Sequence, residues 1–162
     1  MEKRDLYDGE KMLTGETINK GDSIPTGKYY LTVVVFIQNQ NKEFLLQKNK
    51  KYDMWSMTGG HPKSGESSLE GIVTEIDEEI GVQVNSEDVI LFETIKTEDD
   101  FVDLYYLKKD IDIKDIVMQE EEVSEVKWAT IDEIDMLIKD NLFLPPHIEF
   151  YKKLIAYLNN KN

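Results

Sequence analysis

Two long runs of apolar residues dominate the first third of the chain, and their composition predicts strands. Residues 29–37 are β-branched and aromatic, which is typical of a buried strand. Residues 43–47 resume this pattern after a polar turn, so we expect the two segments to pair as a hairpin. Shorter runs of the same kind predict further strands over residues 54–58, 89–95, 101–107 and 123–129.

A change to helical spacing marks three other segments. Residues 67–80 carry an apolar stripe at i, i+3, i+4 and i+7, and Gly81 follows where a helix C-cap favours glycine. Residues 130–139 are amphipathic, with Thr130 placed as the N-cap of a capping box. A final helix is expected over roughly residues 147–158, opened by a pair of prolines that the first turn tolerates.

The order of these elements predicts the fold class. Strand, strand, helix, strand, strand, helix is the order of an α+β domain, in which a mixed sheet is flanked by helices. A chain of 162 residues suits one such domain spanning residues 1–162. Residues 1–27 are turn-rich and are expected to form an N-terminal hairpin or extension. Residues 143–162 are expected to contain the C-terminal helix.

Composition and charge exclude several classes of function. The chain has no cysteine, which excludes disulfides, thiolate zinc sites and a cysteine nucleophile. Its formal net charge of −14 argues against binding to duplex nucleic acid. No apolar run approaches the roughly 18 residues of a membrane span, and the N-terminus lacks the apolar core of a signal peptide. A cytoplasmic protein is therefore expected, and any anionic substrate would need a cation to offset the acidic charge.

Three glutamates on the helix predicted over residues 67–80 form a compact group. Glu75, Glu78 and Glu79 fall within roughly a 100° sector, which lies about 120° from the apolar stripe. Such a group is either a solvated acidic face or the ligand set of a hard cation, Mg²⁺ or Mn²⁺. The glycine-containing loop 59–65 directly precedes the helix and offers backbone N–H groups to anions. Together the two features favour a site for a metal-bridged phosphate.

The same stretch carries a recognisable motif. Its fixed positions follow the spacing of the Nudix box and are occupied by Gly60, Glu66, Glu75, Ile76, Glu78, Glu79, Gly81 and Val82. The chain therefore resembles the Nudix hydrolase superfamily. This resemblance implies an α/β/α sandwich and Mg²⁺-dependent hydrolysis of the diphosphate linkage in a nucleoside diphosphate derivative. One position departs, because Thr74 stands where the family has an arginine that orients the glutamates.

The resemblance also implies a role for each residue of the motif. Glu75 and Glu79 would ligate Mg²⁺, with Mn²⁺ as an alternative. Glu78 would be a further ligand or a catalytic acid that positions water. The Gly60 carbonyl would be an extra ligand, and Glu66 and Gly81 would have structural roles.

The general base is expected outside the motif. Glu122 resembles the glutamate that some family members use for this purpose, on a loop before the strand that carries Trp128. Glu120 and Glu121 are adjacent alternatives.

A narrower likeness connects the chain to the Nudix subgroup related to type I isopentenyl diphosphate isomerase. It rests on residues 5–8, on residues 14–15, and on Trp55 followed by the segment 60–62. The isomerase needs a catalytic cysteine, and Gly59 occupies the matching position, so isomerisation is disfavoured. His61 matches a metal-binding histidine of that enzyme and is a candidate substrate-binding residue, with a structural role as the alternative. His147 lies far away along the chain, in the last helix.

The remaining candidates concern the substrate. Trp55 would either stack on a base or belong to the core. Lys48, Lys50 and Lys51 in the basic loop 48–53 would either contact phosphate or face solvent. A small-molecule diphosphate is the expected partner, and a homodimer is left open. Because Thr74 replaces the arginine of the motif, the alternative is a Nudix domain that binds a diphosphate without cleaving it, or cleaves it weakly.

Overall fold

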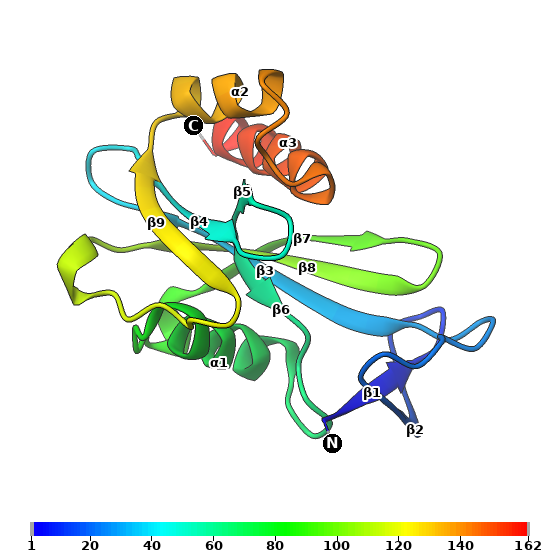
Figure 1. Cartoon of the computed structure of the whole chain (residues 1–162). Coiled ribbons are helices and arrows are strands. Elements are labelled where there is room, and N and C mark those ends of the chain that lie inside the picture. Colours follow the sequence, from blue (N-terminus) through cyan, green and yellow to red (C-terminus); the bar gives the residue numbers. More distant parts are fainter. Residues whose placement is uncertain (1, 162) are drawn as a thin grey trace.

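The computed structural model describes residues 2–161 and arranges them in three layers around one mixed sheet (Figure 1). The strands are β1 (Lys3–Tyr7), β2 (Leu13–Asn19), β3 (Tyr30–Gln38), β4 (Phe44–Asn49), β5 (Met54–Ser56), β6 (Thr58–Gly60), β7 (Ile90–Lys96), β8 (Asp100–Lys108) and β9 (Val123–Ala129). The helices are α1 (Ser68–Ile80), α2 (Ile131–Lys139) and α3 (Pro145–Asn160), and two 3₁₀ turns span Ser86–Asp88 and Ile113–Asp115.

The central sheet has seven strands and confirms the predicted fold class. Its main path runs β5-β4-β3-β8-β7, with β6 paired to β3 and β9 paired to β4. Strands β3 and β8 run parallel, and the other pairs are antiparallel. Helix α1 covers one face of this sheet, and α2 with α3 covers the other (Figure 1).

Strand β3 is buried on both faces, which explains its uninterrupted apolar sequence. Val34 and Phe36 point into the core beneath α2 and α3, whereas Val33 and Val35 point into the core against α1. Successive side chains of a strand face opposite sides of a sheet, so both cores draw on the same segment. The apolar stripe of α1 completes the second core with Ile72, Ile76 and Ile80, each with 0% of its surface exposed.

The expected hairpin between β3 and β4 forms, but its pairing is short. The two strands pair only at Gln38 and Phe44, next to their connecting turn. Beyond that point β3 pairs with β6 on the same side, and β4 pairs with β9 over its whole length. Both strands find hydrogen-bond partners elsewhere in the sheet, so they diverge beyond the turn. Residues of both strands line the pocket described below.

Helix ends follow the predicted signals. Ser67 caps α1 and forms a capping box with Glu70, and Thr130 does the same for α2 with Glu133. Gly81 ends α1 in the left-handed conformation, with φ of 67°. Helix α3 begins at Pro145, two residues earlier than expected. No helix within residues 2–161 is both long and apolar enough to cross a membrane.

The hairpin β1–β2 is a separate two-stranded sheet attached firmly to the domain. Leu6 is buried with 1% exposure. Lys11 donates to both carboxylate oxygens of Asp103 at 2.7 Å, and the Asp103 side chain has 0% exposure. Ser68 and Thr94 also donate to Asp103, at 2.5 and 2.7 Å. Removing one partner of a buried ion pair typically costs about 3–5 kcal/mol, so this contact holds the hairpin in place.

Candidate active site

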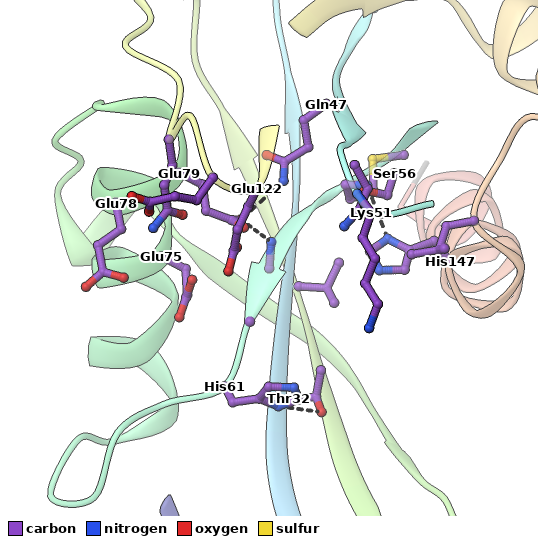
Figure 2. A pocket seen from close by; sticks show the side chains of 18 of the residues that line it. Thr32, Gln47, Lys51, Ser56, His61, Glu75, Glu78, Glu79, Glu122 and His147 are labelled. Atoms are coloured by element: carbon purple, nitrogen blue, oxygen red, sulfur yellow. Dashed lines mark hydrogen bonds between the residues drawn. The ribbon is translucent and has the colours of Figure 1, made fainter. Parts of the chain in front are cut away.

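A pocket of about 640 Å³ opens where β4 diverges from β3 (Figure 2). Its walls come from β3, β4, the β5–β6 segment, α1, the loop before β9, the hairpin β1–β2 and the start of α3. Figure 2 shows Glu75, Glu78 and Glu79 on α1 at one side, with Lys51 and His147 at the opposite side. The pocket therefore combines carboxylates from the motif with side chains from distant parts of the chain.

Glu79 is the most deeply buried carboxyl group of the pocket, with 4% exposure. Its Oε1 accepts hydrogen bonds from the Gly59 backbone N–H at 3.0 Å and from Gln47 Nε2 at 3.3 Å. Gln47 is itself oriented by Thr58, whose hydroxyl donates to Gln47 Oε1 at 2.9 Å. Burial, followed by the charge of Glu75, raises the pKa of Glu79 to about 8. Without a cation this group is mostly protonated at neutral pH.

Glu75 lies one turn earlier on α1, against the backbone of β6. A Cβ atom added at Gly60 would lie 2.4 Å from Glu75 Cδ, so a larger residue there would displace this carboxyl group from its position. Burial and the neighbouring charge of Glu78 raise the pKa of Glu75 to about 8. The half-buried Glu75 and the buried Glu79 together offer an oxygen donor set, which is the chemistry that Mg²⁺ and Mn²⁺ prefer.

Glu78 is held by a residue of the preceding loop. Lys63 Nζ donates to Glu78 Oε1 at 2.7 Å, and both side chains are more than 40% exposed, at 44% and 41%. Within residues 2–161, no three His, Cys, Asp or Glu side chains already converge as a metal site. Glu78 would have to leave Lys63 to converge with Glu75 and Glu79 on one cation.

Glu122 reaches the pocket from the loop that precedes β9, as its sequence position predicts. Its charge contributes to the raised pKa values of both Glu75 and Glu79, which places the three groups within electrostatic reach. Glu121 also lines the pocket. This loop is tied to the end of α1, because Gln119 N–H donates to the carbonyl of Glu79 at 3.0 Å.

Gly81 explains how the loop can approach α1 so closely. A Cβ atom there would lie 2.9 Å from Val117 Cβ, and its positive φ is also strained for other residues. The Val117 N–H donates to the carbonyl of Ile80 at 3.0 Å. Glycine at this position is thus needed both to end the helix and to seat the loop that carries Glu122.

Thr74, which departs from the motif, contacts a different acid from the three that face the pocket. Its hydroxyl donates to Glu66 Oε2 at 2.8 Å, and Glu66 Oε1 accepts from the Lys63 N–H at 2.7 Å. Glu66 therefore connects α1 to the loop that contains Lys63. Lys63, the charge partner of Glu78, therefore comes from that loop. The motif of this chain lacks the arginine that the family has at position 74.

Both histidines of the chain line the pocket, which corrects the expectation for His147. Its Nδ1 accepts from the Met57 N–H at 3.1 Å, and burial lowers its pKa to about 4. Because Nδ1 accepts, the neutral ring carries its proton on Nε2. His61 Nδ1 lies 3.2 Å from the Leu31 carbonyl and 3.3 Å from the Thr32 hydroxyl. Burial lowers the pKa of His61 as well.

Trp55 and Lys48 lie outside the pocket lining. Trp55 is 8% exposed within the core beneath α2 and α3, and Lys127 Nζ lies 4.3 Å from the centre of its ring. Lys48 pairs with Asp53 at 3.3 Å. The basic side chains that do line the pocket are Arg4, Lys20 and Lys51.

The sequence marks Lys51 as a possible phosphate contact in the basic loop, but it does not point to Gln47 or Arg4. No pattern in the chain connects either residue to a motif more than ten residues away. Their contribution depends on strand pairing and on the docking of the hairpin β1–β2.

Comparisons with known proteins agree with this geometry. Residues 28–154 match the family described as NUDIX domain. An uncharacterized Nudix hydrolase of Listeria monocytogenes is 28% identical over 151 residues, covering 90% of this chain and 89% of the relative. A homologous Nudix hydrolase of Listeria innocua is equally similar, at 28% identity over the same length.

Solved structures share the fold at lower identity. DR0079 from Deinococcus radiodurans superposes with a TM-score of 0.72 at 18% identity, covering 88% of this chain and 91% of that one. The NUDIX domain of Shewanella oneidensis NrtR, complexed with ADP ribose, gives 0.65 at 16% identity, with coverages of 80% and 88%. Since the family match spans most of the sequence, this chain belongs to the NUDIX domain family.

Proposed function

We propose that this chain is a Mg²⁺-dependent hydrolase that cleaves the diphosphate linkage of a nucleoside diphosphate derivative by attack of water on phosphorus. The observation that carries the proposal is the grouping of Glu75, Glu79 and Glu122 at one wall of the pocket. Family membership supports the reaction class. The ADP ribose in the related NrtR domain supports a nucleotide derivative as the substrate class.

Glu75 and Glu79 would hold the metal ion, with Glu78 and the Gly60 carbonyl as further ligands. When bound, the ion supplies charge neutralisation at the phosphate oxygens. Gln47 and the Gly59 N–H keep Glu79 oriented toward the pocket through their hydrogen bonds to its Oε1. Glycine at position 60 leaves the Glu75 carboxyl group its place against the backbone.

Glu122 would accept the proton of the attacking water. It lies on a loop rather than on α1 and is exposed, so its carboxyl group is free to approach the water. Glu78 is the alternative base, and its pairing with Lys63 makes it the less available of the two. On the opposite wall, His147 Nε2–H and Lys51 Nζ are donors suited to the polar part of the substrate.

The geometry at Gly59 argues against an isomerase, which needs a cysteine at this position. A Cβ atom at Gly59 would lie 2.5 Å from the Val33 carbonyl oxygen, so the backbone leaves no space for a cysteine side chain there. Binding of a diphosphate without cleavage is the remaining alternative, and the replacement of the motif arginine by Thr74 motivates it.

A panel of nucleoside diphosphate derivatives, assayed for phosphate and nucleotide products with and without Mg²⁺, tests the proposal. Glu122→Gln is expected to lower kcat by about 10²–10⁴-fold, the usual contribution of a general base. Glu120→Gln is the matched control, because Glu120 lies in the same acidic turn but does not line the pocket.

If the protein hydrolyses no diphosphate of the panel but binds one tightly in calorimetry, it is a diphosphate-binding protein and not a hydrolase. Full activity of Glu122→Gln would assign the base elsewhere and leave the hydrolase intact.

A further inference from the structure

Arg4 is the only arginine in the sequence, and it lines the pocket that holds the motif glutamates. It lies on β1, in the hairpin β1–β2, which precedes the part of the chain that matches the NUDIX domain, residues 28–154. Glu2 and Lys20 of the same hairpin also line the pocket. The hairpin is therefore an addition to the family domain that forms part of the binding surface.

The guanidinium of Arg4 has donors to spare. Its side chain is 15% exposed, and among residues 2–161 its ion-pair partner is Glu2, with Nε to Oε2 at 3.4 Å. A guanidinium has five N–H donors in a planar fork that matches the oxygens of a phosphate. The charge of Arg4 also contributes to the lowered pKa of His61, so it lies within electrostatic reach of that ring.

Strand β1 is tied directly to the loop that carries the motif. Ser64 Oγ donates to Asp5 at 2.6 Å, and the Gly65 N–H donates to the same carboxylate at 3.0 Å. The Ser64 N–H donates to the carbonyl of Lys3 at 2.8 Å. These bonds flank Arg4 on both sides. Together with the buried pair of Lys11 and Asp103, they fix its position relative to α1.

The pocket is strongly acidic, so an anionic substrate needs a cationic side chain such as Arg4 to bind there. Six glutamates line it, and its basic side chains within residues 2–161 are Arg4, Lys20 and Lys51. A bound cation offsets the charge near Glu75 and Glu79, but an additional phosphate beyond that cation would need its own donor. Arg4 and Lys20 come from one hairpin and are the cations that it contributes to the pocket lining.

We propose that Arg4 binds a free terminal phosphate of the substrate, which makes the hairpin β1–β2 a specificity element of this enzyme. The inference rests on the proposed function, since it names the substrate class of the same site. Substrates that end in a free phosphate are then favoured over diphosphates that are capped at both ends by uncharged groups.

Kinetics with a matched substrate pair test this assignment. ADP has a free terminal phosphate, whereas the corresponding phosphate of ADP-glucose is esterified to an uncharged sugar. Arg4→Gln is expected to raise KM for ADP about 10- to 100-fold, as for the loss of a charged hydrogen bond, with kcat changed by less than about threefold. For ADP-glucose both constants are expected to stay within about twofold of the wild-type values. Arg4→Lys is expected to restore only part of the loss, because lysine lacks the bidentate fork.

Lys3→Gln is the matched control. It removes the same charge from the same strand, at an exposed side chain outside the pocket lining, and is expected to leave both substrates unaffected. Equal effects of Arg4→Gln on the two substrates, or no effect on either, would overturn the inference while leaving the hydrolase in place.

A binding measurement separates failure of this inference from failure of the proposed function. If the wild-type protein hydrolyses neither compound, calorimetry with adenosine α,β-methylene diphosphate and Mg²⁺ replaces the kinetics. An affinity at least about tenfold weaker in Arg4→Gln than in Lys3→Gln would support Arg4 as a phosphate-binding residue. Equal affinities, or no binding by the wild-type protein, would overturn it.

Discussion

Replacing Glu79 by glutamine separates the role of this residue in the fold from its role in metal binding. Glu79 accepts hydrogen bonds from Gly59 and Gln47 through Oε1, and a glutamine carbonyl oxygen in the same place can accept both. With a pKa of about 8, the group is largely uncharged at neutral pH in the metal-free protein. Glu79→Gln is therefore expected to change the free energy of unfolding of the metal-free protein by less than about 1 kcal/mol at pH 7.

The magnitude of the electrostatic cost sets the expected pH dependence. Raising a carboxyl pKa from 4.5 to about 8 corresponds to as much as about 5 kcal/mol, since each tenfold change in ionisation is about 1.4 kcal/mol. Between these two pH values the unfolded chain has released protons that the folded state retains. The free energy of unfolding of the metal-free wild-type protein therefore falls as pH rises through this window, by up to about 1.4 kcal/mol per pH unit for each such group.

Urea unfolding of the wild-type protein and Glu79→Gln, with EDTA or with saturating Mg²⁺, measures both effects. The pH-dependent loss of stability is expected to be smaller in Glu79→Gln, because one of the two carboxyl groups with a raised pKa is removed. Mg²⁺ is expected to stabilise the wild-type protein and to have little effect on the variant, whose metal affinity should fall at least about 100-fold. Asp77→Asn, on the exposed face of α1, is the control for loss of one charge.

Two results would refute the reasoning. Equal stabilisation of the wild-type protein and Glu79→Gln by Mg²⁺ would remove Glu79 from the ligand set. A metal-free wild-type protein whose stability does not fall between pH 4.5 and 8 would show that the carboxyl groups of α1 are not desolvated as the structure indicates.

Two further substitutions test other contacts. Gly60→Ala would place a Cβ 2.4 Å from Glu75 Cδ and should displace this carboxyl group, which lowers the Mg²⁺ affinity measured by calorimetry about 10- to 100-fold. The control Gly9→Ala should leave the Mg²⁺ affinity unchanged. An unchanged affinity in Gly60→Ala would contradict the role of Glu75. Lys11→Met leaves the buried Asp103 without its cation and should lower the free energy of unfolding, measured with urea, by about 3 kcal/mol. The control Lys28→Met breaks the exposed pair with Glu16 and should lower it by less than about 1 kcal/mol. Equal losses in the two variants would show that burial of Asp103 does not matter.

The elements that sequence predicts well here are those with a local cause. The stripe of α1, its Ser67 cap and its Gly81 end all lie within one segment, and the structure reproduces them to within a residue. The pairing of β3 with β4 is shorter than the sequence predicts, because each strand has competing partners elsewhere in the sheet. Strand β9 lies more than seventy residues from β4 along the chain and pairs with its whole length.

Strand pairing also decided the outcome for Lys48 and Trp55. In the antiparallel registers of β4, Lys48 is opposite both Trp55 and Glu125, so the lysine finds acidic and aromatic neighbours within the sheet. Trp55 then turns into the core beneath α2 and α3. Composition of the basic loop alone offered no means of knowing which of its lysines faces the pocket.

The sequence by itself determined the fold class, the helix that carries Glu75, Glu78 and Glu79, and the glycines that this helix needs, because each depends on spacing within a few turns of chain. Only the tertiary structure decided what faces those acids. Gln47 and His147 reach the pocket through strand pairing and helix packing, and Arg4 reaches it because the hairpin β1–β2 docks beside the motif loop. Contacts between residues far apart in the chain follow from packing of the whole domain, and no local pattern encodes them.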